Sequence, residues 1–167
     1  VSTVMSNYGF KQAIEKFNFD LIETPVGDKY VAEAMKKYDA ALGGEQSGHI
    51  IISDLLPVGD GLVTLIYVLK AMQHFGVALS DFKKENLYEY PQQLTNLELK
   101  NKLNDEELEY INQIALDMSI KKDLDGRYLI RNSGTEPLLR VLVEAKSNEA
   151  MEDFSNELIT KINKYLN

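Results

Sequence analysis

The sequence predicts an α/β protein in which a mixed, mostly parallel sheet with helices is followed by a small α+β domain with an antiparallel sheet. Strand-like and helix-like segments alternate through residues 2–75, which is the pattern of parallel sheets covered by helices. A polar, charged stretch at residues 80–87 then interrupts this pattern and is expected to be a connection. The remaining segments follow the order strand, helix, strand, strand, helix. We therefore expect two domains, residues 1–82 and residues 83–167.

In the first half, short apolar runs mark the strands, and apolar residues at helical spacing mark the helices. Strands are expected at residues 2–6, 19–23, 40–42 and 49–53, and helices at residues 10–17, 31–38 and 60–75. Gly43 and Gly44 are expected to form a turn. The helix at residues 60–75, which Asp60 can cap, has apolar residues on a broad face, so we expect it to be well buried.

In the second half, the spacing of apolar residues predicts one antiparallel sheet with two helices. Strands are expected at residues 93–99, 128–130 and 138–145, and a helix at residues 105–118. Asp125 and Gly126 are expected to form a turn before the second strand. Ser147 or Asn148 can cap the last helix. The residues that this helix is expected to bury are Met151, Phe154, Leu158, Ile162 and Tyr165.

The composition excludes several classes of protein. The chain is 44% hydrophobic, enough to bury a core, and it has no cysteine for a disulfide scaffold or a Cys-ligated zinc module. The net charge of −8 argues against general nucleic-acid binding, but it does not exclude a small anion held by local donors. No apolar run has the length of a membrane span, and no signal-peptide pattern is present. We expect a cytoplasmic protein that binds neither nucleic acid nor membrane, and the opening on Val1 leads us to expect a piece of a longer chain.

The clearest candidate site is the loop between the two strands at residues 128–130 and 138–145. Two hydroxyl side chains flank Gly134, which can let successive backbone N–H groups face one anion. Arg131 adds a planar fork that matches phosphate oxygens. A plain hairpin turn, with the hydroxyls serving their own backbone, is the alternative. The candidate phosphate-binding residues are Arg131, Asn132, Ser133, Gly134, Thr135 and Arg140.

A second candidate site is the glycine-flanked turn at residues 43–49. It combines a carboxylate, an amide, a hydroxyl and an imidazole, the mixture of donors and acceptors that a sugar requires. The alternative is a solvated turn followed by a core histidine. The candidate sugar-binding residues are Glu45, Gln46, Ser47, Gly48 and His49. Asp28 and Lys29, after Gly27, are a third and weaker candidate that also reads as an ordinary helix start.

These segments resemble motifs of the α-D-phosphohexomutase family. Residues 44–49 carry the pattern GE-x-SGH of its sugar-binding loop, and residues 131–135 carry the pattern R-x-SGT of its phosphate-binding loop. Residues 26–31 resemble the VGD-[RK]-YV stretch of its third domain, with Lys29 where many members have Arg. The resemblance covers nearly the whole chain in the family's order and corresponds to most of domain three and all of domain four. Residues 88–125 match poorly.

The resemblance implies that the complete protein is a four-domain enzyme. Members carry a phosphoserine in the first domain and an Asp-rich loop that binds Mg²⁺ in the second, and neither motif occurs in this sequence. Gln46 and the segment 3–7 resemble members that interconvert glucosamine 6-phosphate and glucosamine 1-phosphate through a bisphosphorylated intermediate, in the amino-sugar metabolism that supplies peptidoglycan precursors. By resemblance, Glu45 and Ser47 contact sugar hydroxyls, residues 131–135 hold the unreacting phosphate, and Asp28, Lys29 and His49 line the cleft.

The chain is therefore expected to hold a phosphosugar together with the N-terminal domains of the same protein, and to be inactive alone. It is expected to contain no metal site of its own. Two alternatives remain open. The enzyme can be a phosphomannomutase or phosphoglucomutase, or the chain can be a stand-alone, non-catalytic phosphosugar-binding module.

Overall fold

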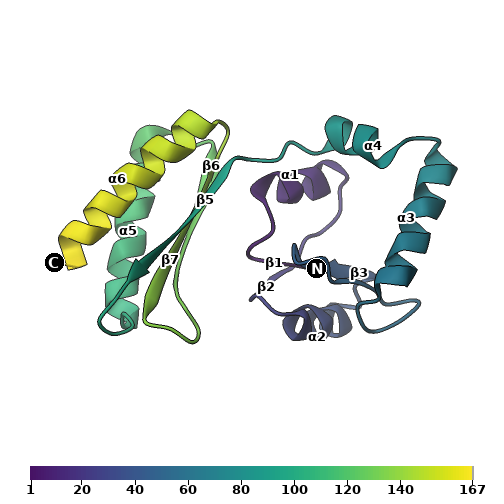
Figure 1. Ribbon diagram of the computed structural model, residues 1–167, viewed down its shortest axis with the longest axis horizontal. Coiled ribbons are helices and arrows are strands. Elements are labelled where there is room, and N and C mark those ends of the chain that lie inside the picture. The colour runs from purple at the N-terminus through teal and green to yellow at the C-terminus, as the bar shows by residue number, and fades with distance from the viewer. Residues whose placement is uncertain (167) are drawn as a thin grey trace. The chain divides into compact units, whose positions relative to one another are not determined.

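Residues 1–166 are described by the structure, a computed structural model, and they divide into two units. The first unit is Val1–Glu89 and the second begins at Tyr90. The predicted combination of a mixed sheet and an antiparallel sheet, each with helices, is confirmed. Figure 1 shows the elements of both units.

The sheet of the first unit has four short strands in the order β2-β1-β3-β4. Strand β1 (Ser2–Thr3) is parallel to both β2 (Glu23–Thr24) and β3 (Leu42–Gly44), whereas β3 is antiparallel to β4 (Ile50–Ile52). The expected strand at residues 19–23 is wrong in extent, because only its last residue pairs. Gly43 and Gly44 lie within β3 and not in a turn. A Cβ on Gly43 would overlap the side chains of Met35 and Val31, so glycine there allows a helix to pack closely on the strand.

Helices α1 (Tyr8–Lys16) and α2 (Asp28–Tyr38) lie on opposite sides of these strands (Figure 1). Only α2 contributes to a buried apolar core, through Val31 and Met35, which pack with Ile51 of β4. A core of this size stabilises a unit only weakly.

Helix α3 (Gly61–Phe75) begins where predicted, because the Asp60 carboxylate accepts hydrogen bonds from the N–H groups of Leu62 and Val63, both at 2.9 Å. The prediction that α3 is buried is wrong. None of its residues is buried, and Leu62 is 73% exposed. An apolar stripe predicts that a helix needs a cover, but no described residue supplies that cover. Most of residues 80–87, which were expected to be a connection, are helical, since Leu79–Asn86 forms helix α4.

The second unit has the predicted order β5 (Gln92–Glu98), α5 (Asp105–Lys122), β6 (Gly126–Asn132), β7 (Leu138–Ala145) and α6 (Asn148–Leu166). The antiparallel sheet has the order β5-β7-β6, with β7 in the centre. Both helices cover one face of this sheet (Figure 1). The turn expected at Asp125 and Gly126 ends one residue earlier, and Gly126 is the first residue of β6.

The core between this sheet and its helices is continuous and nearly inaccessible to solvent. Leu139, Val141 and Val143 of β7 belong to one core with Phe154 and Leu158 of α6, and all five are at most 1% exposed. Asn104 and Glu107 form a reciprocal capping box at the start of α5, and the Ser147 hydroxyl, not Asn148, accepts a hydrogen bond from the start of α6.

Tyr165 is 40% exposed, which corrects its assignment to the core. It lies in the last turn of α6, and its ring packs against that of Tyr110, with the centroids 4.7 Å apart. Among residues 1–166, no single helix is long and apolar enough to cross a membrane, and α3 with α4 meets that length and composition only as a pair bent by 77°.

Candidate functional site

Strand alternation divides the predicted phosphate-binding residues between the two faces of the second unit's sheet. Successive side chains of a strand point to opposite faces. Leu139 and Val141 of β7 lie in the core under the helices, so Arg140 between them points to the face away from the helices. Its partner across the ladder is Arg131 of β6, and Ser133 follows on the same face. The structure thus brings together Arg131, Ser133 and Arg140, residues that are up to nine positions apart in the sequence.

Two arginines stand directly opposite each other in this arrangement. Like charges in a cross-strand pair destabilise a sheet. Burial, and then the charge of Arg140, lowers the pKa of the Arg131 guanidinium below its usual value. The nearest carboxylate to Arg140 is that of Glu136, whose Oε2 lies 4.0 Å from the Arg140 Nη2. The pair therefore forms a local positive charge that its surroundings neutralise only weakly.

Two buried donors beside this pair have no hydrogen-bond partner among the described residues. They are the Ser133 hydroxyl, on a residue 2% exposed, and the Arg140 Nε. A buried polar group without a partner typically costs about 1–3 kcal/mol, so each one calls for a partner such as water, an ion or a ligand. The Ser2 and Ser155 hydroxyls, away from this loop, are also without a partner among the described residues. An oxyanion placed at this end of the strands would screen the two guanidinium groups from each other.

Asn132 holds the loop in place and does not face the arginine pair, because its side chain points to the other face of the sheet. Its Nδ2 donates a hydrogen bond of 2.8 Å to the Leu103 carbonyl, and its Oδ1 accepts one of 3.2 Å from the Leu103 N–H. Leu99 N–H also donates to the Pro137 carbonyl at 2.9 Å, and Lys102 Nζ donates to the Gly134 carbonyl at 2.6 Å. The loop after β5 therefore holds the predicted phosphate-binding loop in place through hydrogen bonds. Sequence reasoning missed this support, because its residues lie about thirty positions away and carry no motif.

The glycine of this loop is not forced by the observed backbone. Gly134 is absent from the glycines with positive φ, and a Cβ there would meet no atom within 4 Å. The expectation that Gly134 is needed to turn successive N–H groups toward an anion is therefore not supported by this conformation. Gly134 and Thr135 are exposed, which leaves that side of the loop open to a ligand.

The predicted sugar loop is the tight turn between β3 and β4 in the first unit. Glu45 N–H donates to the His49 carbonyl at 2.9 Å, and Gly48, with φ of 95°, donates its N–H to the Glu45 carbonyl at 3.1 Å. The Glu45 side chain is only 10% exposed. Its Oε1 accepts a hydrogen bond of 2.6 Å from the N–H of Gly27.

Gly27 thereby links two of the three sequence motifs. It is the N-cap of α2, and its φ of 135° is a conformation that other residues rarely adopt. A carboxylate at a helix N-terminus is favoured by the helix dipole and by the unpaired N–H groups there. Glu45 is therefore held in place by the chain itself and is not a freely solvated turn residue.

Ser47 and His49 complete a short hydrogen-bonded chain on this carboxylate. The Ser47 hydroxyl donates to Glu45 Oε2 at 3.2 Å and lies 3.3 Å from His49 Nδ1. When the hydroxyl proton points to Glu45, Nδ1 must carry a proton to donate to Ser47, which leaves Nε2 of a neutral ring as an acceptor. The His49 side chain is 61% exposed, so it is not a core histidine. Gln46 is exposed as well.

Asp28 and Lys29 lie in the first turn of α2. Asp28 Oδ1 accepts a hydrogen bond of 2.7 Å from the Lys29 N–H, and Lys29 Nζ lies 3.8 Å from Glu33 Oε1. Lys29 is largely exposed, so its ammonium can move to another partner. Within residues 1–166, no group of three or more His, Asp or Glu side chains is arranged to hold a metal ion.

The sequence matches two domain families along almost its whole length. Residues 1–90 match the phosphoglucomutase/phosphomannomutase alpha/beta/alpha domain III, and residues 94–161 match the phosphoglucomutase/phosphomannomutase C-terminal domain. The chain is 42% identical to the phosphoglucosamine mutase of Bacillus subtilis over 159 residues, which is 95% of this chain and 35% of the relative. It is 46% identical to the phosphoglucosamine mutase of Streptococcus agalactiae over 154 residues, 91% of this chain and 34% of the relative. The chain thus spans about a third of the length of these relatives.

Solved structures give the same picture for the fold. An N-acetylphosphoglucosamine mutase from Aspergillus fumigatus superimposes with a TM-score of 0.82 over 99% of this chain and 38% of its own, at 19% identity. The same fungal enzyme in complex with GlcNAc-6P and magnesium superimposes with a TM-score of 0.80. At these identities the likeness concerns the fold alone.

Proposed function

Because the chain belongs to the phosphoglucomutase/phosphomannomutase family, we propose that it is the substrate-holding C-terminal part of an enzyme that interconverts glucosamine 6-phosphate and glucosamine 1-phosphate. The curated relatives quoted above bear the name phosphoglucosamine mutase, which favours this sugar over the alternatives of glucose and mannose. The proposal includes a cytoplasmic location and a part in amino-sugar metabolism that leads to peptidoglycan precursors.

One observation carries the proposal: the Arg131–Arg140 pair with the unpartnered Ser133 hydroxyl and Arg140 Nε beside it. Charge-assisted hydrogen bonds from guanidinium groups to phosphate are among the strongest in proteins, and Arg is favoured where the recognition is bidentate. In our proposal the phosphate that is not reacting lies here, with the exposed Thr135 and the backbone of Asn132 and Gly134 as further donors. The plain-hairpin alternative leaves the arginine pair and both orphaned donors without a reason.

In our proposal the sugar loop binds hydroxyl groups of the pyranose ring. Glu45 Oε2, held by the Gly27 contact on the other oxygen, accepts from one hydroxyl, and Ser47 rotates to donate to or accept from another. Gln46 and the Gly48 backbone offer an amide and an N–H on the exposed side, while His49, Asp28 and Lys29 line the approach. The fixed Glu45 acceptor and the rotatable Ser47 hydroxyl suit a sugar that binds with its phosphate at either position 6 or position 1.

Phosphoryl transfer depends on positioning and on electrostatic stabilisation, and these residues supply the positioning. We propose that the phosphoserine and the Mg²⁺ loop belong to the part of the longer protein that precedes these two domains. The described residues do not fit Mg²⁺, which takes carboxylate and phosphate oxygens in octahedral geometry, because they contain no such cluster. The chain's own residues bind the phosphosugar, orient it and hold the far phosphate.

Titration of the 167-residue chain with inorganic phosphate tests the proposal. Because the phosphate loop and its support lie within one unit, weak binding is expected, with NMR shifts confined to residues 131–135 and Arg140. Titration with chloride at equal ionic strength is the control. Shifts that map elsewhere would contradict the site, and mutase turnover by this chain alone would contradict the division of labour.

Glu45→Ala in the longer enzyme tests the sugar loop. We expect kcat/KM for glucosamine 6-phosphate to fall by a factor equivalent to about 1–3 kcal/mol, the effect of unpaired polar groups in the complex. Comparison with glucose and mannose phosphates in the same assay identifies the sugar. An unchanged kcat/KM in the variant would mean that Glu45 has only a structural role at the start of α2.

A further inference from the structure

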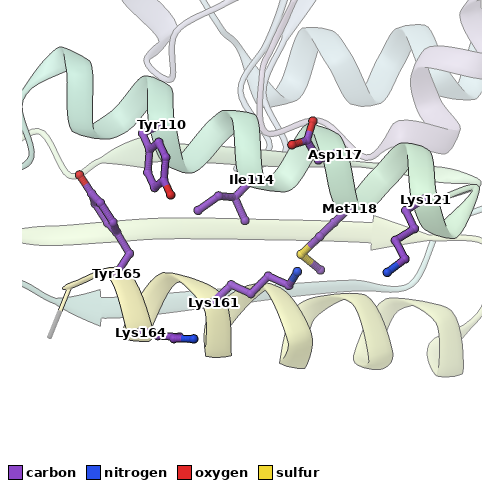
Figure 2. Close-up of a pocket in the computed structure, with 8 residues that line it drawn as sticks. All are labelled: Tyr110, Ile114, Asp117, Met118, Lys121, Lys161, Lys164 and Tyr165. Carbon is purple, nitrogen blue, oxygen red and sulfur yellow. The ribbon is translucent and has the colours of Figure 1, made fainter.

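A groove runs between α5 and α6 (Figure 2). These helices cover the face of the sheet opposite to that of Arg131 and Arg140. The two helices are antiparallel, since Tyr110 near the start of α5 packs on Tyr165 at the end of α6, and Lys122 at the end of α5 donates to Asp153 at 2.6 Å. The groove encloses about 490 Å³, with Ile114 and Met118 on its floor. Nothing in the proposed phosphosugar site makes use of it.

The charge of the groove is opposite to that of the whole chain. Three lysines line it, Lys121 from α5 and Lys161 and Lys164 from α6, against one carboxylate, that of Asp117. The chain as a whole carries a net charge of −8. Lys161 is paired with Glu157 at 3.5 Å, whereas Lys121 and Lys164 make no ion pair with any described residue.

The shape of the groove selects the kind of ligand. From Tyr110 to Lys121 the groove follows three turns of α5, which is about 16 Å at 1.5 Å per residue. Tyr110 is 53% exposed and Tyr165 is 40% exposed, so the groove is open to solvent at the end that these rings form. Small-molecule sites enclose most of their ligand, which an open groove cannot do. An amphipathic helix lying between two helices buries one face and leaves the other in water, and this geometry recurs in peptide recognition.

Single-stranded nucleic acid is the other anionic polymer that tyrosines and lysines can bind. The floor of the groove disfavours it here, because Ile114 and Met118 offer no aromatic ring on which successive bases could stack. Met and Tyr, in contrast, are enriched where proteins bind one another.

We propose that the α5–α6 groove docks an acidic, amphipathic helix of a partner protein. Apolar side chains of that helix, at positions i, i+3 or i+4 and i+7, would lie over Ile114 and Met118 and against the Tyr110–Tyr165 pair. Glu or Asp residues flanking them would face Lys121 and Lys164. This proposal does not depend on the proposed phosphosugar chemistry, because it rests on the opposite side of the same unit.

The experiment is a selection of displayed helical peptides of about 16 residues, long enough to follow the groove, on the 167-residue chain. Expected winners combine the apolar spacing with Asp or Glu on both sides. Their affinity should fall about tenfold or more when Lys121→Glu and Lys164→Glu are combined, and it should weaken as salt is raised. Lys100→Glu, an exposed lysine elsewhere in the same unit, is the matched control and should change affinity by less than about twofold.

Far-UV circular dichroism and amide NMR spectra of each variant establish that the fold is kept. Ile114→Ala, which preserves every charge, should also weaken the selected peptides, and this separates helix docking from simple charge attraction. The proposal is overturned by any of three results: no enrichment, winners without acidic residues, or winners that bind the double lysine variant as well as the unaltered chain. Displacement of the winners by oligouridylate would instead assign the groove to nucleic acid.

Discussion

Replacing Arg131 with Met should stabilise the fold while it weakens phosphate binding. Met keeps most of the aliphatic stem of the arginine and removes its charge. In the absence of an anion, the substitution relieves the cross-strand repulsion with Arg140 and the partial burial of the guanidinium, both of which lower the pKa of Arg131. A folded state that holds a proton less tightly than the unfolded chain is less stable wherever that proton is bound, which for arginine includes neutral pH.

The size of the effect follows from the geometry. Like charges directly opposite in a sheet are unfavourable by about 0.2–1 kcal/mol, and the partial exposure of both side chains favours the lower half of that range. Arg131→Met should therefore raise the free energy of unfolding by about 0.5 kcal/mol in chloride buffer. The same substitution removes charge-assisted hydrogen bonds to phosphate worth about 1.5–3 kcal/mol, so the dissociation constant should rise roughly 10- to 100-fold.

Urea unfolding of the 167-residue chain, with and without phosphate at equal ionic strength, measures both effects together. Phosphate should stabilise the unaltered chain by mass action and should stabilise the variant little. Arg131→Lys is the matched control, because it keeps the charge and loses the fork. It should bind phosphate more weakly than arginine without the gain in stability. A variant that is destabilised by about 1 kcal/mol or more and still responds fully to phosphate would refute the argument.

Three further changes test the contacts around the two loops and between the helices. Gly27→Ala should destabilise the first unit by about 1–3 kcal/mol, because a Cβ is strained at φ 135°, and should release Glu45, seen as line broadening of the sugar loop in NMR spectra. Asn132→Asp keeps the acceptor for the Leu103 N–H but removes the donor to the Leu103 carbonyl. Thermal unfolding should therefore show a free energy of unfolding lower by about 1–3 kcal/mol. An unchanged melting temperature would mean that this donor is dispensable. Lys122→Gln should raise the pKa of the Glu157 carboxyl, which hydrogen bonding to Lys122 lowers, toward its usual value in a carbon-13 titration. Because the folded-state pKa of Glu157 is depressed, its pair with Lys122 contributes to the free energy of unfolding above the usual glutamate pKa. This contribution is lost as pH falls through the folded-state pKa. The pH dependence is expected only in the chain that retains Lys122.

The second unit was the easier half to predict from sequence, because its structure is set by local patterns. The alternation of residues 138–145 predicts which side chains of β7 enter the core, and Leu139, Val141 and Val143 do so. The faces of Arg131 and Asn132 follow only from the structure, in which β6 extends to Asn132, beyond the strand expected at residues 128–130. The register that aligns Arg131 with Arg140 also requires the structure, because register depends on the whole hairpin and on the loop that supports it.

The first unit was harder to predict, because its contacts are not local. The apolar pattern of α3 indicates a helix that is covered, yet periodicity contains no information about which part of a protein provides the cover. Gly43 illustrates the opposite error. A glycine pair reads as a turn in sequence, whereas here the absence of a Cβ allows Met35 to approach the strand. The Gly27–Glu45 contact joins residues 18 positions apart, and neither residue alone predicts it.

The bare surface of α3 determines how the purified chain will behave at high concentration. Leu62, Leu65, Ile66, Leu69 and Phe75 are each more than half exposed, so one side of the chain is attractive to any other apolar surface. The net charge of −8 opposes self-association, but charge repulsion is long-ranged only at low ionic strength. Colloidal stability should therefore be lost on adding salt or on acidification, under conditions in which the second unit is still fully folded. Precipitation of this chain should thus report on the exposed apolar surface of α3, and not on the free energy of unfolding.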